Sequence, residues 1–415
     1  MDDTRSLRAG LVVFSADEIR RSLSLEITDG RISGWEPVAE GTLTPEERGT
    51  ILAPGLVNAH AHLDLGALRG KVPSTGSFTD WVGRVVSARA ELSALAIAEG
   101  VVASAREAVR TGTTSVIDID STGATAAALG SCSVSRESRA RLPRVTILAE
   151  VLDGSPAGRS ARTEAALERA RAAIEAGQGL SPHGSHTVGD DLMAELGAMR
   201  QRAAAAGRRL PVAVHWAETR AETDWLLRGE GPFATWLGPS PFLSGTERLQ
   251  RAGLLEHSLV IHGNDPQAGE AARLAAMDCT LVHCPGSHRF FGREPFPLGT
   301  YRAHGVRIAL GTDSWASNEQ LDMRRELRLA RESLGLDAPE VWRMATENGA
   351  YCFDDISVTG RIEENGAADI VAYVHPRMGE TSDLGALEAT CLDVLTRDEP
   401  RITGVWVAGR DFSSA

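Results

Sequence analysis

LAPGLVNAHAHLDL, residues 52–65, is an apolar run that ends on two histidines, His60 and His62, with one alanine between them. The run has the composition of a buried strand, in which successive side chains point to opposite faces. Residues i and i+2 share a face, so both imidazoles can reach one point in space. This spacing is typical of metal ligands, although an isolated pair is more often a surface pair or a pair packed in the core.

The composition indicates a globular protein that acts on small molecules. The chain has 415 residues with 42% hydrophobic content, enough for one large domain with an appendage or for two ordinary domains. A net charge of −13 disfavours nucleic acid and membranes as partners and leaves a homo-oligomer open. No apolar run reaches the ~20 residues of a membrane span, and the N-terminus lacks a signal-peptide pattern, so we expect a cytoplasmic protein.

Cysteine and lysine usage disfavour several other chemistries. The five cysteines are scattered and form no CxxC pair, which fits packing residues in a reduced compartment. Lys71 is the only lysine among 43 basic residues, and it lies in the loop-like segment RGKVPSTGS. A Schiff base, a P-loop or a carbamylated metal-bridging lysine each needs a lysine at a specific place, so these sites are largely excluded.

The middle of the chain alternates strands and helices. From about residue 51 to 355, helical stretches separate eight short apolar segments: NAHAH, TSVIDI, RVTILAEV, GLSPHGSHTV, LPVAVHWAE, SLVIHGN, CTLVHCPGSH and RIALGTDS. Eight strand-then-helix units predict an α/β fold, a parallel (β/α)8 TIM-like barrel with its active site at the carboxyl ends of the strands. The helical stretches 92–112 and 161–177 end in glycine, a common stop signal.

Both ends of the chain are predicted to form short strands instead. Residues 1–50 alternate apolar and polar positions, with a hairpin turn expected at Asp29-Gly30. The segments DIVAYV and RITGVWVAGRDF repeat this pattern near the C-terminus. We therefore expect residues 1–52 and 362–415 to form one small β-sandwich domain and residues 53–361 to form the catalytic barrel.

The histidines gather at the expected carboxyl ends of the strands. Three of the eleven, His257, His304 and His375, lie elsewhere and receive no role. The other eight lie at or just beyond strand ends, as Asp313 does in the GTDS segment: His60, His62, His183, His186, His215, His262, His283 and His288. Because barrel strands converge at that face, three imidazoles and a carboxylate can hold one borderline divalent ion there.

With these motifs the chain resembles the amidohydrolase superfamily, in its branch of mononuclear-metal deaminases and chlorohydrolases, over nearly its whole length. The matching motifs are PGLVNAHAH, SPHGSHTV, HWAE, the histidine of VIHGN, HCPGSH and GTDS. The resemblance implies a barrel with a β-sandwich, and one divalent metal ion, Zn2+ or alternatively Fe2+, bound by His60, His62, His215 and Asp313. It also implies that Glu218 is the proton shuttle and that His262 helps to activate or orient the attacking water.

The same residues support hydrolysis of a ring carbon–nitrogen bond. A divalent ion lowers the pKa of a bound water molecule towards neutrality, which makes the water a nucleophile for an electron-poor ring carbon. Glu218 can protonate a ring nitrogen and later pass a proton to departing ammonia, and Asp313 can accept a proton from the water. Alone, Glu218 would more often be a solvated residue at a helix start. The whole set favours an active site.

The segments HLDLGALRGKVPSTGSFTDWVGRVV and HCPGSHRFFG look most like those of aminodeoxyfutalosine deaminases. That resemblance implies one small-molecule partner, the adenine nucleoside 6-amino-6-deoxyfutalosine, converted to futalosine and ammonia in menaquinone biosynthesis. His288 stands where many relatives have asparagine, which disfavours adenosine and S-adenosylhomocysteine as substrates. The alternatives are deamination of another purine or pyrimidine, triazine-type dechlorination, cyclic-amide hydrolysis, and a binding protein without activity.

The expected substrate contacts follow the fourth and seventh strands and are His183, His186, His283, Ser287, His288 and Arg289. Arg289 precedes Phe290 and Phe291. A guanidinium beside aromatic rings can take an aryl carboxylate through two parallel hydrogen bonds while the rings pack against the aryl group. The alternative is that Arg289 is an exposed loop residue and that the phenylalanines belong to the core.

Overall fold

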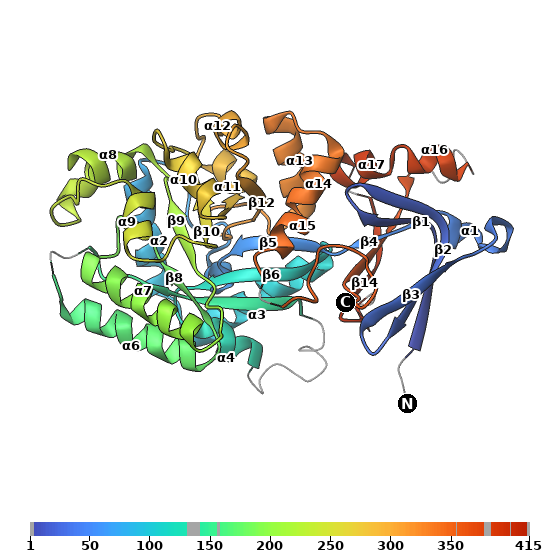
Figure 1. The fold of residues 1–415 in the computed structure, drawn as a ribbon, viewed down its shortest axis with the longest axis horizontal. Coiled ribbons are helices and arrows are strands. Elements are labelled where there is room, and N and C mark those ends of the chain that lie inside the picture. The colour runs from blue at the N-terminus through green and yellow to red at the C-terminus, as the bar shows by residue number, and fades with distance from the viewer. Residues whose placement is uncertain are drawn as a thin grey trace.

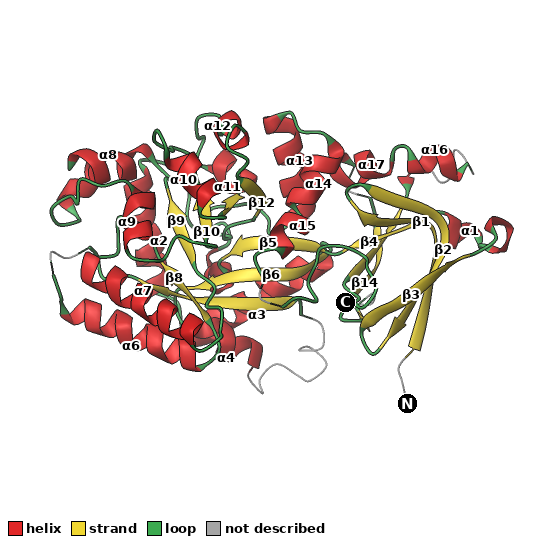
Figure 2. Ribbon diagram, viewed as in Figure 1, coloured by secondary structure: helices red, strands yellow, loops and turns green. Residues whose placement is uncertain are grey.

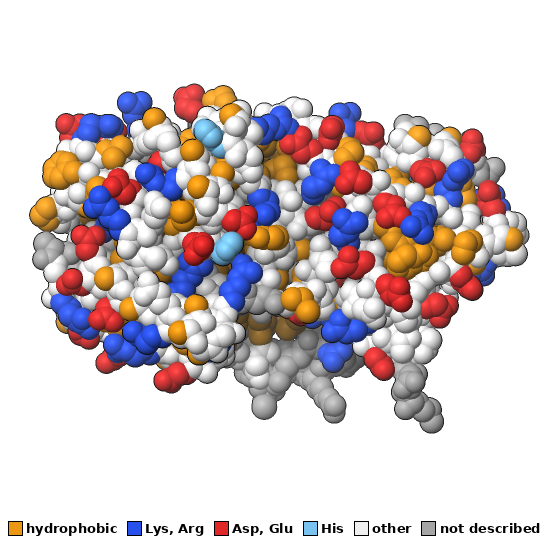
Figure 3. All heavy atoms as spheres, viewed as in Figure 1, with side chains coloured by type: hydrophobic (Ala, Val, Ile, Leu, Met, Phe, Trp, Pro, Cys, Tyr) orange, Lys and Arg blue, Asp and Glu red, His pale blue; other side chains and the backbone are white. Residues whose placement is uncertain are grey.

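The computed structural model describes residues 4–130, 142–155, 158–353, 355–376, 383–398 and 400–412 (Figure 1). Cys132 lies outside the described residues, and the described cysteines are free and buried: Cys279, Cys284, Cys352 and Cys391. Within these ranges, no helix combines the length and the apolar content that crossing a membrane would require. Acidic and basic side chains are interspersed over the face shown in Figure 3.

Eight strands in the middle of the chain form two four-stranded parallel sheets, at the positions that the sequence predicts. The first sheet contains, in spatial order, β5 (Leu56–Ala61), β6 (Thr113–Asp120), β7 (Arg144–Val151) and β8 (Gly179–Pro182). The second contains β12 (Arg307–Leu310), β11 (Thr280–His283), β10 (Leu259–His262) and β9 (Ala213–Trp216). Figure 2 shows helices arranged around these strands.

Isolated parallel bridges link the two sheets at both of their edges. Leu180 pairs with Val212 where β8 meets β9, and Ala61 pairs with Asp313 where β12 meets β5. Apolar residues from seven of these strands also form one buried cluster, drawn from both sheets: Val57, Ala59, Ile117, Ile119, Leu148, Ala213, Leu259, Ile261, Val282 and Ala309. The parallel sheets thus curl around a shared interior.

Hydrogen bonds hold β5 and β12 together at their shared edge, and a glycine allows the two strands to approach each other closely. The amide nitrogen of Asn58 donates to the hydroxyl of Thr312 at 2.7 Å, and the backbone N–H of Thr312 donates to the Asn58 side-chain oxygen at 3.1 Å. A Cβ added to Gly311 would lie 2.9 Å from the carbonyl oxygen of His60. Only glycine at this position lets the strand ends meet so closely.

The helices follow the order of the strands along the chain. Among the described residues between β5 and β13 (Ile370–Val374) they are α2 (Phe78–Ala90), α3 (Ala94–Arg110), α4 (Ala124–Gly130), α6 (Ala161–Glu175), α7 (Asp190–Ala205), α8 (Arg220–Arg228), α9 (Gly245–Arg251), α10 (Glu270–Ala276), α11 (Pro285–Phe290), α12 (Leu298–Arg302), α13 (Met323–Leu334), α14 (Ala338–Met344) and α15 (Glu347–Ala350), while α1 (Pro45–Arg48), α16 (Leu384–Glu388) and α17 (Cys391–Arg397) lie near the two ends of the chain. The sequence accounts for α6 well. Ser160 caps it in a capping box with Thr163, and Gly177 follows its end with φ +76°.

Both ends of the chain contribute to one separate mixed sheet of seven strands. Its spatial order is β15 (Arg410–Asp411), β14 (Ile402–Val407), β13 (Ile370–Val374), β4 (Thr50–Pro54), β1 (Thr4–Ser15), β2 (Glu18–Thr28) and β3 (Arg31–Pro37). Strands β1 and β4 are parallel and the other pairs are antiparallel. Asp29 and Gly30 form the expected β2–β3 turn, with φ +49° and +80°.

The terminal sheet curls back on itself instead of being split into two separate sheets. The N–H of Ile32 donates to the carbonyl of Gly366, and the N–H of Ala368 donates to the carbonyl of Gly30. Val12 and Phe14 lie in a cluster enclosed by the sheet, whereas the intervening Val13 packs into the larger core that is shared with the parallel strands. A single bent sheet can therefore supply the enclosed core that a sandwich would need.

Gly311→Ala should destabilise the protein, because the new methyl group would lie 2.8 Å from Cβ of His60 and 3.0 Å from its backbone nitrogen. We expect a cost of about 1–3 kcal/mol, typical of overpacking, seen as a lower midpoint of thermal unfolding. Gly299→Ala is the matched control, since nothing lies within 4 Å of the position that its added methyl group would take, and alanine favours helix. Equal midpoints for both variants would contradict this account of the edge.

Candidate metal centre and active site

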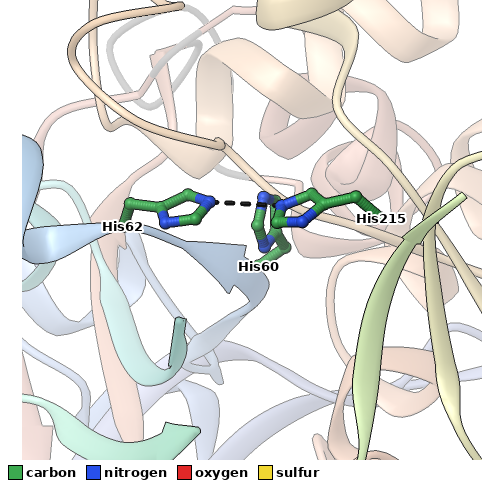
Figure 4. A group of neighbouring side chains, drawn as sticks. All are labelled: His60, His62 and His215. Atoms are coloured by element: carbon green, nitrogen blue, oxygen red, sulfur yellow. Dashed lines mark hydrogen bonds between the residues drawn. The ribbon is translucent and has the colours of Figure 1, made fainter. Parts of the chain in front are cut away.

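The two histidines of the opening motif lie at the carboxyl end of strand β5. His60 lies within the strand with 0% of its surface exposed, and His62 lies just beyond the strand end and is also buried. Figure 4 shows both rings converging with that of His215 from β9. The Nε2 atoms of His62 and His215 are 3.3 Å apart, and the His60 ring centroid lies 4.9 Å from that of His62. The three imidazoles therefore share one point in space.

The residues after β8 orient His215. Its Nδ1–H donates to the carbonyl oxygen of His183 at 2.7 Å, which leaves Nε2 to face His62. Burial lowers the pKa of His215 well below its ordinary value, and the neighbouring His183 and His60 add to the effect. His215 is thus a neutral imidazole, the form that binds metal ions.

The carboxylate that follows β12 faces the same point. Oδ1 of Asp313 lies 3.5 Å from Nε2 of His60 and 4.0 Å from Nε2 of His62. Oδ2 accepts a hydrogen bond of 2.8 Å from the hydroxyl of Ser287. Asp313 has φ +60°, a costly conformation for a residue with a side chain, and such strain is common at functional sites.

These donors fit one divalent metal ion. One ligand atom from each of His60, His62 and His215 lies within 4.8 Å of the others, and the same holds for His60, His262 and Asp313. Within the described residues, neither ring nitrogen of His60 nor Nδ1 of His62 has a hydrogen-bond partner. Buried nitrogens without partners are costly unless a ligand satisfies them. Three imidazoles and a carboxylate suit zinc or iron(II).

Glu218 and His262 lie beside this cluster and face each other. Nε2 of His262, the last residue of β10, is 3.7 Å from Oε2 of Glu218. Burial raises the pKa of Glu218 to about 8, so its carboxyl group carries a proton at neutral pH. Burial lowers the pKa of His262 to about 3, so its imidazole is neutral. A protonated acid and a neutral imidazole are the forms needed to donate and to accept a proton.

Glu222 holds the turn that presents Glu218, and sequence patterns alone did not single it out. Its carboxylate accepts hydrogen bonds from the backbone N–H groups of Ala217, at 3.1 Å, and of Glu218, at 3.0 Å. Ala217 has φ +49°, so the turn is strained, and two charge-assisted hydrogen bonds offset that strain. One sequence signal could have found Glu222, the segment TRAE. In it Thr219 caps α8 and Glu222 follows three residues later, which is the spacing at which an acid can bond back to the backbone before a helix.

A second buried acid joins the loops that carry Ser287 and Asp313. Glu326 of α13 accepts from the backbone N–H of Gly286 at 2.6 Å and from the amide of Asn318 at 2.8 Å. The same Asn318 amide donates to the carbonyl oxygen of Thr312 at 2.8 Å. The β11–α11 loop and the β12 loop are thus tied to one carboxyl group, and helical periodicity alone gave no reason to assign Glu326 this role.

Two further buried acids, Glu150 and Asp118, lie close to the histidines or to the residues beside them. One ligand atom from each of Glu150, His183 and His215 lies within 4.8 Å of the others, and burial raises the pKa of Glu150 to about 7. Asp118, two residues before the end of β6, accepts a hydrogen bond of 2.7 Å from the backbone N–H of Leu63 and so fixes the residue after His62. The sequence motifs assigned no role to Glu150.

The predicted substrate contacts differ in their surroundings. The His183 ring lies 5.1 Å from that of His215, and the His283 ring lies 5.4 Å from that of His288. His186 is buried, 3.6 Å from Glu222. Within the described residues, Nδ1 of His283 and Nε2 of His288 are buried without hydrogen-bond partners, so both could bind a ligand.

Arg289 is exposed and has no polar side-chain partner among the described residues. The structure therefore does not bring Arg289 into the cluster, and its role stays a prediction. Arg293, four residues later, is instead the arginine that contacts Glu218, at 3.2 Å. The sequence motifs did not point to Arg293, because only the chain reversal at Gly292, with φ +57°, turns it inward.

Comparison with known proteins agrees with this geometry. Residues 51–410 match the model of the amidohydrolase family. An aminodeoxyfutalosine deaminase from Deinococcus radiodurans is 32% identical over 73% of each chain. A 5-methylthioadenosine/S-adenosylhomocysteine deaminase from Halobacterium salinarum is 30% identical over 89% of this chain and 84% of its own. The crystal structure of a zinc-bound adenosine deaminase from Xanthomonas campestris superposes with a TM-score of 0.76 and 25% identity, covering 98% of this chain and 92% of its own.

One assignment agrees with the sequence motifs, with the parallel strands and with the range of residues that matches the family model. The family model covers most of the chain, and these relatives are deaminases. The chain therefore belongs to the amidohydrolase family and is a hydrolytic enzyme of the deaminase type.

Proposed function

We propose that the chain is a metal-dependent deaminase of an adenine nucleoside, and that it binds a single zinc ion through His60, His62, His215 and Asp313. The observation that carries the proposal is that His60, His62 and His215 converge, with Oδ1 of Asp313 within 4.0 Å of the first two, beside a protonated Glu218. A divalent ion held there would supply Lewis-acid activation of a water molecule. Iron(II) suits the same donors, so the choice of zinc rests on the zinc-bound relative.

Each acid and imidazole then has a defined task. Asp313 accepts a proton from the attacking water, and His262 orients that water from the side of β10. Glu218 donates its proton to a ring nitrogen, which makes the neighbouring ring carbon electrophilic, and later passes a proton to the leaving amino group. Water supplies the new carbonyl oxygen, and its two protons end on the ring nitrogen and on ammonia.

The proposed substrate is 6-amino-6-deoxyfutalosine, converted to futalosine and ammonia in menaquinone biosynthesis. The aminodeoxyfutalosine deaminase of Deinococcus radiodurans supports this choice, since it is 32% identical to the chain over 73% of its length. His183, His186, His283, Ser287 and His288 are the proposed contacts to the nucleoside. Arg289 at the surface is the proposed contact to the distal carboxylate. A binding protein without activity is disfavoured because the four donors are present and converge.

The proposal also covers the architecture around the site. We propose that the two parallel sheets form one closed (β/α)8 barrel over residues 53–361, supported by the bridges at both edges and by the shared apolar interior. Residues 1–52 and 362–415 would form the second domain, supported by the common sheet. In this arrangement all four donors lie at or just beyond the carboxyl ends of strands, where barrel enzymes carry their active sites.

His215→Ala should lose most of the bound metal and most of the activity, because it removes the ligand fixed by the His183 carbonyl. Metal content per chain, measured by elemental analysis after purification, is the test. His257→Ala is the control, since His257 pairs with Asp278 at the surface and should keep about one ion per chain. Full metal content in the His215 variant would place the metal elsewhere.

Glu218→Gln should keep the metal and lose about a hundredfold or more in turnover number, because an amide cannot exchange the proton that a carboxyl group shuttles. Glu230→Gln, a change of the same kind at an exposed residue, should behave as the unaltered protein does. Steady-state kinetics and metal analysis on the same samples distinguish the possibilities. Metal loss in the Glu218 variant would make Glu218 a ligand.

The metal-replete protein should release ammonia from 6-amino-6-deoxyfutalosine far faster than from adenosine, guanine or cytosine. The test is an ammonia-release screen over these compounds, with chloride release from a chlorinated triazine measured in parallel. Equal or faster turnover of adenosine would reject the substrate, and chloride release without ammonia would favour a chlorohydrolase. An Arg289→Ala variant with an unchanged specificity constant would reject the carboxylate contact alone.

A further inference from the structure

Arg293 enters the site from the loop that follows α11. Gly292 adopts φ +57°, which reverses the chain, and the backbone N–H of Arg293 donates to the carbonyl of His288 at 3.2 Å. The Arg293 side chain is 16% exposed, so it lies largely inside the protein. An arginine held this deeply needs anionic or aromatic partners, because burying an uncompensated charge is costly.

Two phenylalanines clamp the guanidinium of Arg293. Its Cζ lies 5.0 Å from the ring centroid of Phe78, at the start of α2, and 4.8 Å from that of Phe291. The two rings are 5.5 Å apart and close to perpendicular, and Trp81 packs on Phe291 at 4.9 Å. A planar guanidinium against aromatic faces is restricted in its orientation as well as in its position.

The clamped guanidinium meets one oxygen of Glu218. A terminal nitrogen of Arg293 donates to Oε1 at 3.2 Å, whereas Oε2 lies 3.7 Å from Nε2 of His262. A guanidinium has donors and no acceptor, so the oxygen it contacts must act as an acceptor. A proton on the Glu218 carboxyl group is therefore directed to Oε2, on the side of His262.

We propose that Arg293 is a positioning residue for the proton shuttle, which holds Oε1 of Glu218 so that Oε2 alone carries the exchangeable proton. The inference rests on the proposed role of Glu218. It assigns to Arg293 no contact with the substrate and no step of its own. The proton on Oε2 passes to the ring nitrogen. One of the two protons of the attacking water then reaches Oε2 and passes to the leaving amino group, and the other, released as the carbonyl group forms, restores the proton on Oε2, so the cycle balances.

The charges around Glu218 agree with this role. Burial raises the pKa of Glu218, and the Arg293 charge is the strongest influence in the opposite direction. A carboxyl group that must both give and take a proton benefits from such opposed influences, because neither protonation state is then strongly preferred. Arg293 thus affects both the orientation of the Glu218 carboxyl group and its ability to give and take a proton.

The test uses the full-length, metal-replete protein and any amine substrate that it deaminates. Arg293→Met, which removes the charge and the donors, should lower the turnover number at least tenfold, with less than a threefold change in KM and unchanged metal content. Arg293→Lys, which keeps a donor-only cation, should recover part of that loss. Arg302→Met, which breaks a surface contact with Glu340, is the matched control and should lose less than twofold.

A double-variant cycle separates positioning from a general structural effect. In the Glu218→Gln background, Arg293→Met should cost less than twofold, because no proton remains to be directed. The same tenfold loss in both backgrounds would overturn the inference, as would an unchanged turnover number in Arg293→Met. Thermal unfolding of each variant identifies any that fails to fold, in which case Arg293→Lys and Arg293→Gln take its place in the cycle.

Failure of the inference and failure of the proposed function give different results. A Glu218→Gln variant with full activity, or a protein that deaminates none of the compounds, would reject the proposed function. In that event the crystal structure of Arg293→Met decides the inference without activity. A Glu218 carboxylate that turns away from its original orientation supports the positioning role, and one that keeps it overturns the role.

Discussion

The close approach of β5 and β12 is the constraint on which the site depends. Asn58 bonds Thr312 from two residues before His60, and Gly311 lets the backbone of His60 lie against the start of the next loop. The N–H groups of Thr312 and Asp313 then both donate to the carbonyl of His60, at 3.0 and 3.1 Å. One edge between two strands therefore places a histidine and an aspartate, 253 positions apart in the chain, within reach of a single ion.

Two loop elements of the site, the HWAE turn and the HCPGSH loop, are each held by a buried acid from a later helix. Glu222 takes the N–H groups of Ala217 and Glu218, and Glu326 takes the N–H of Gly286. Burial alone would raise the pKa of Glu222, but the nearby His186 and these hydrogen bonds outweigh it and lower the pKa below its ordinary value. The loops can therefore hold strained backbone, such as Ala217 with φ +49°, without losing their geometry.

Local patterns predicted the strands, the helices and the chemical residue types, because strand alternation, capping and the HxH spacing act over a few residues. The parallel arrangement then brings these local patterns together, since parallel strands have their carboxyl ends at one face. Arg293 escaped prediction for the opposite reason. Its contact with Glu218 depends on a reversal at Gly292 and on Phe78 from a distant helix, and no local period encodes either. Arg289, which directly precedes two phenylalanines, matched the expected pattern of a carboxylate-binding arginine better than Arg293 did, and yet it lies at the surface.

Burial also changes the pKa of the titratable groups around the site. Burial lowers the pKa of His183, His215 and His262 and raises the pKa of Glu150 and Glu218, so it disfavours charge on these five groups. Nearby histidines and hydrogen bonds outweigh burial at Glu222 and Asp313 and lower the pKa of both carboxyl groups. Neutral imidazoles are free to bind a cation, and acids that hold a proton at neutral pH can give it away. A cation in such a place interacts strongly with each carboxylate, since little water screens the interaction. Low polarity therefore favours both metal binding and proton transfer, and the apolar burial that stabilises the parallel sheets also prepares the site at the carboxyl ends of their strands.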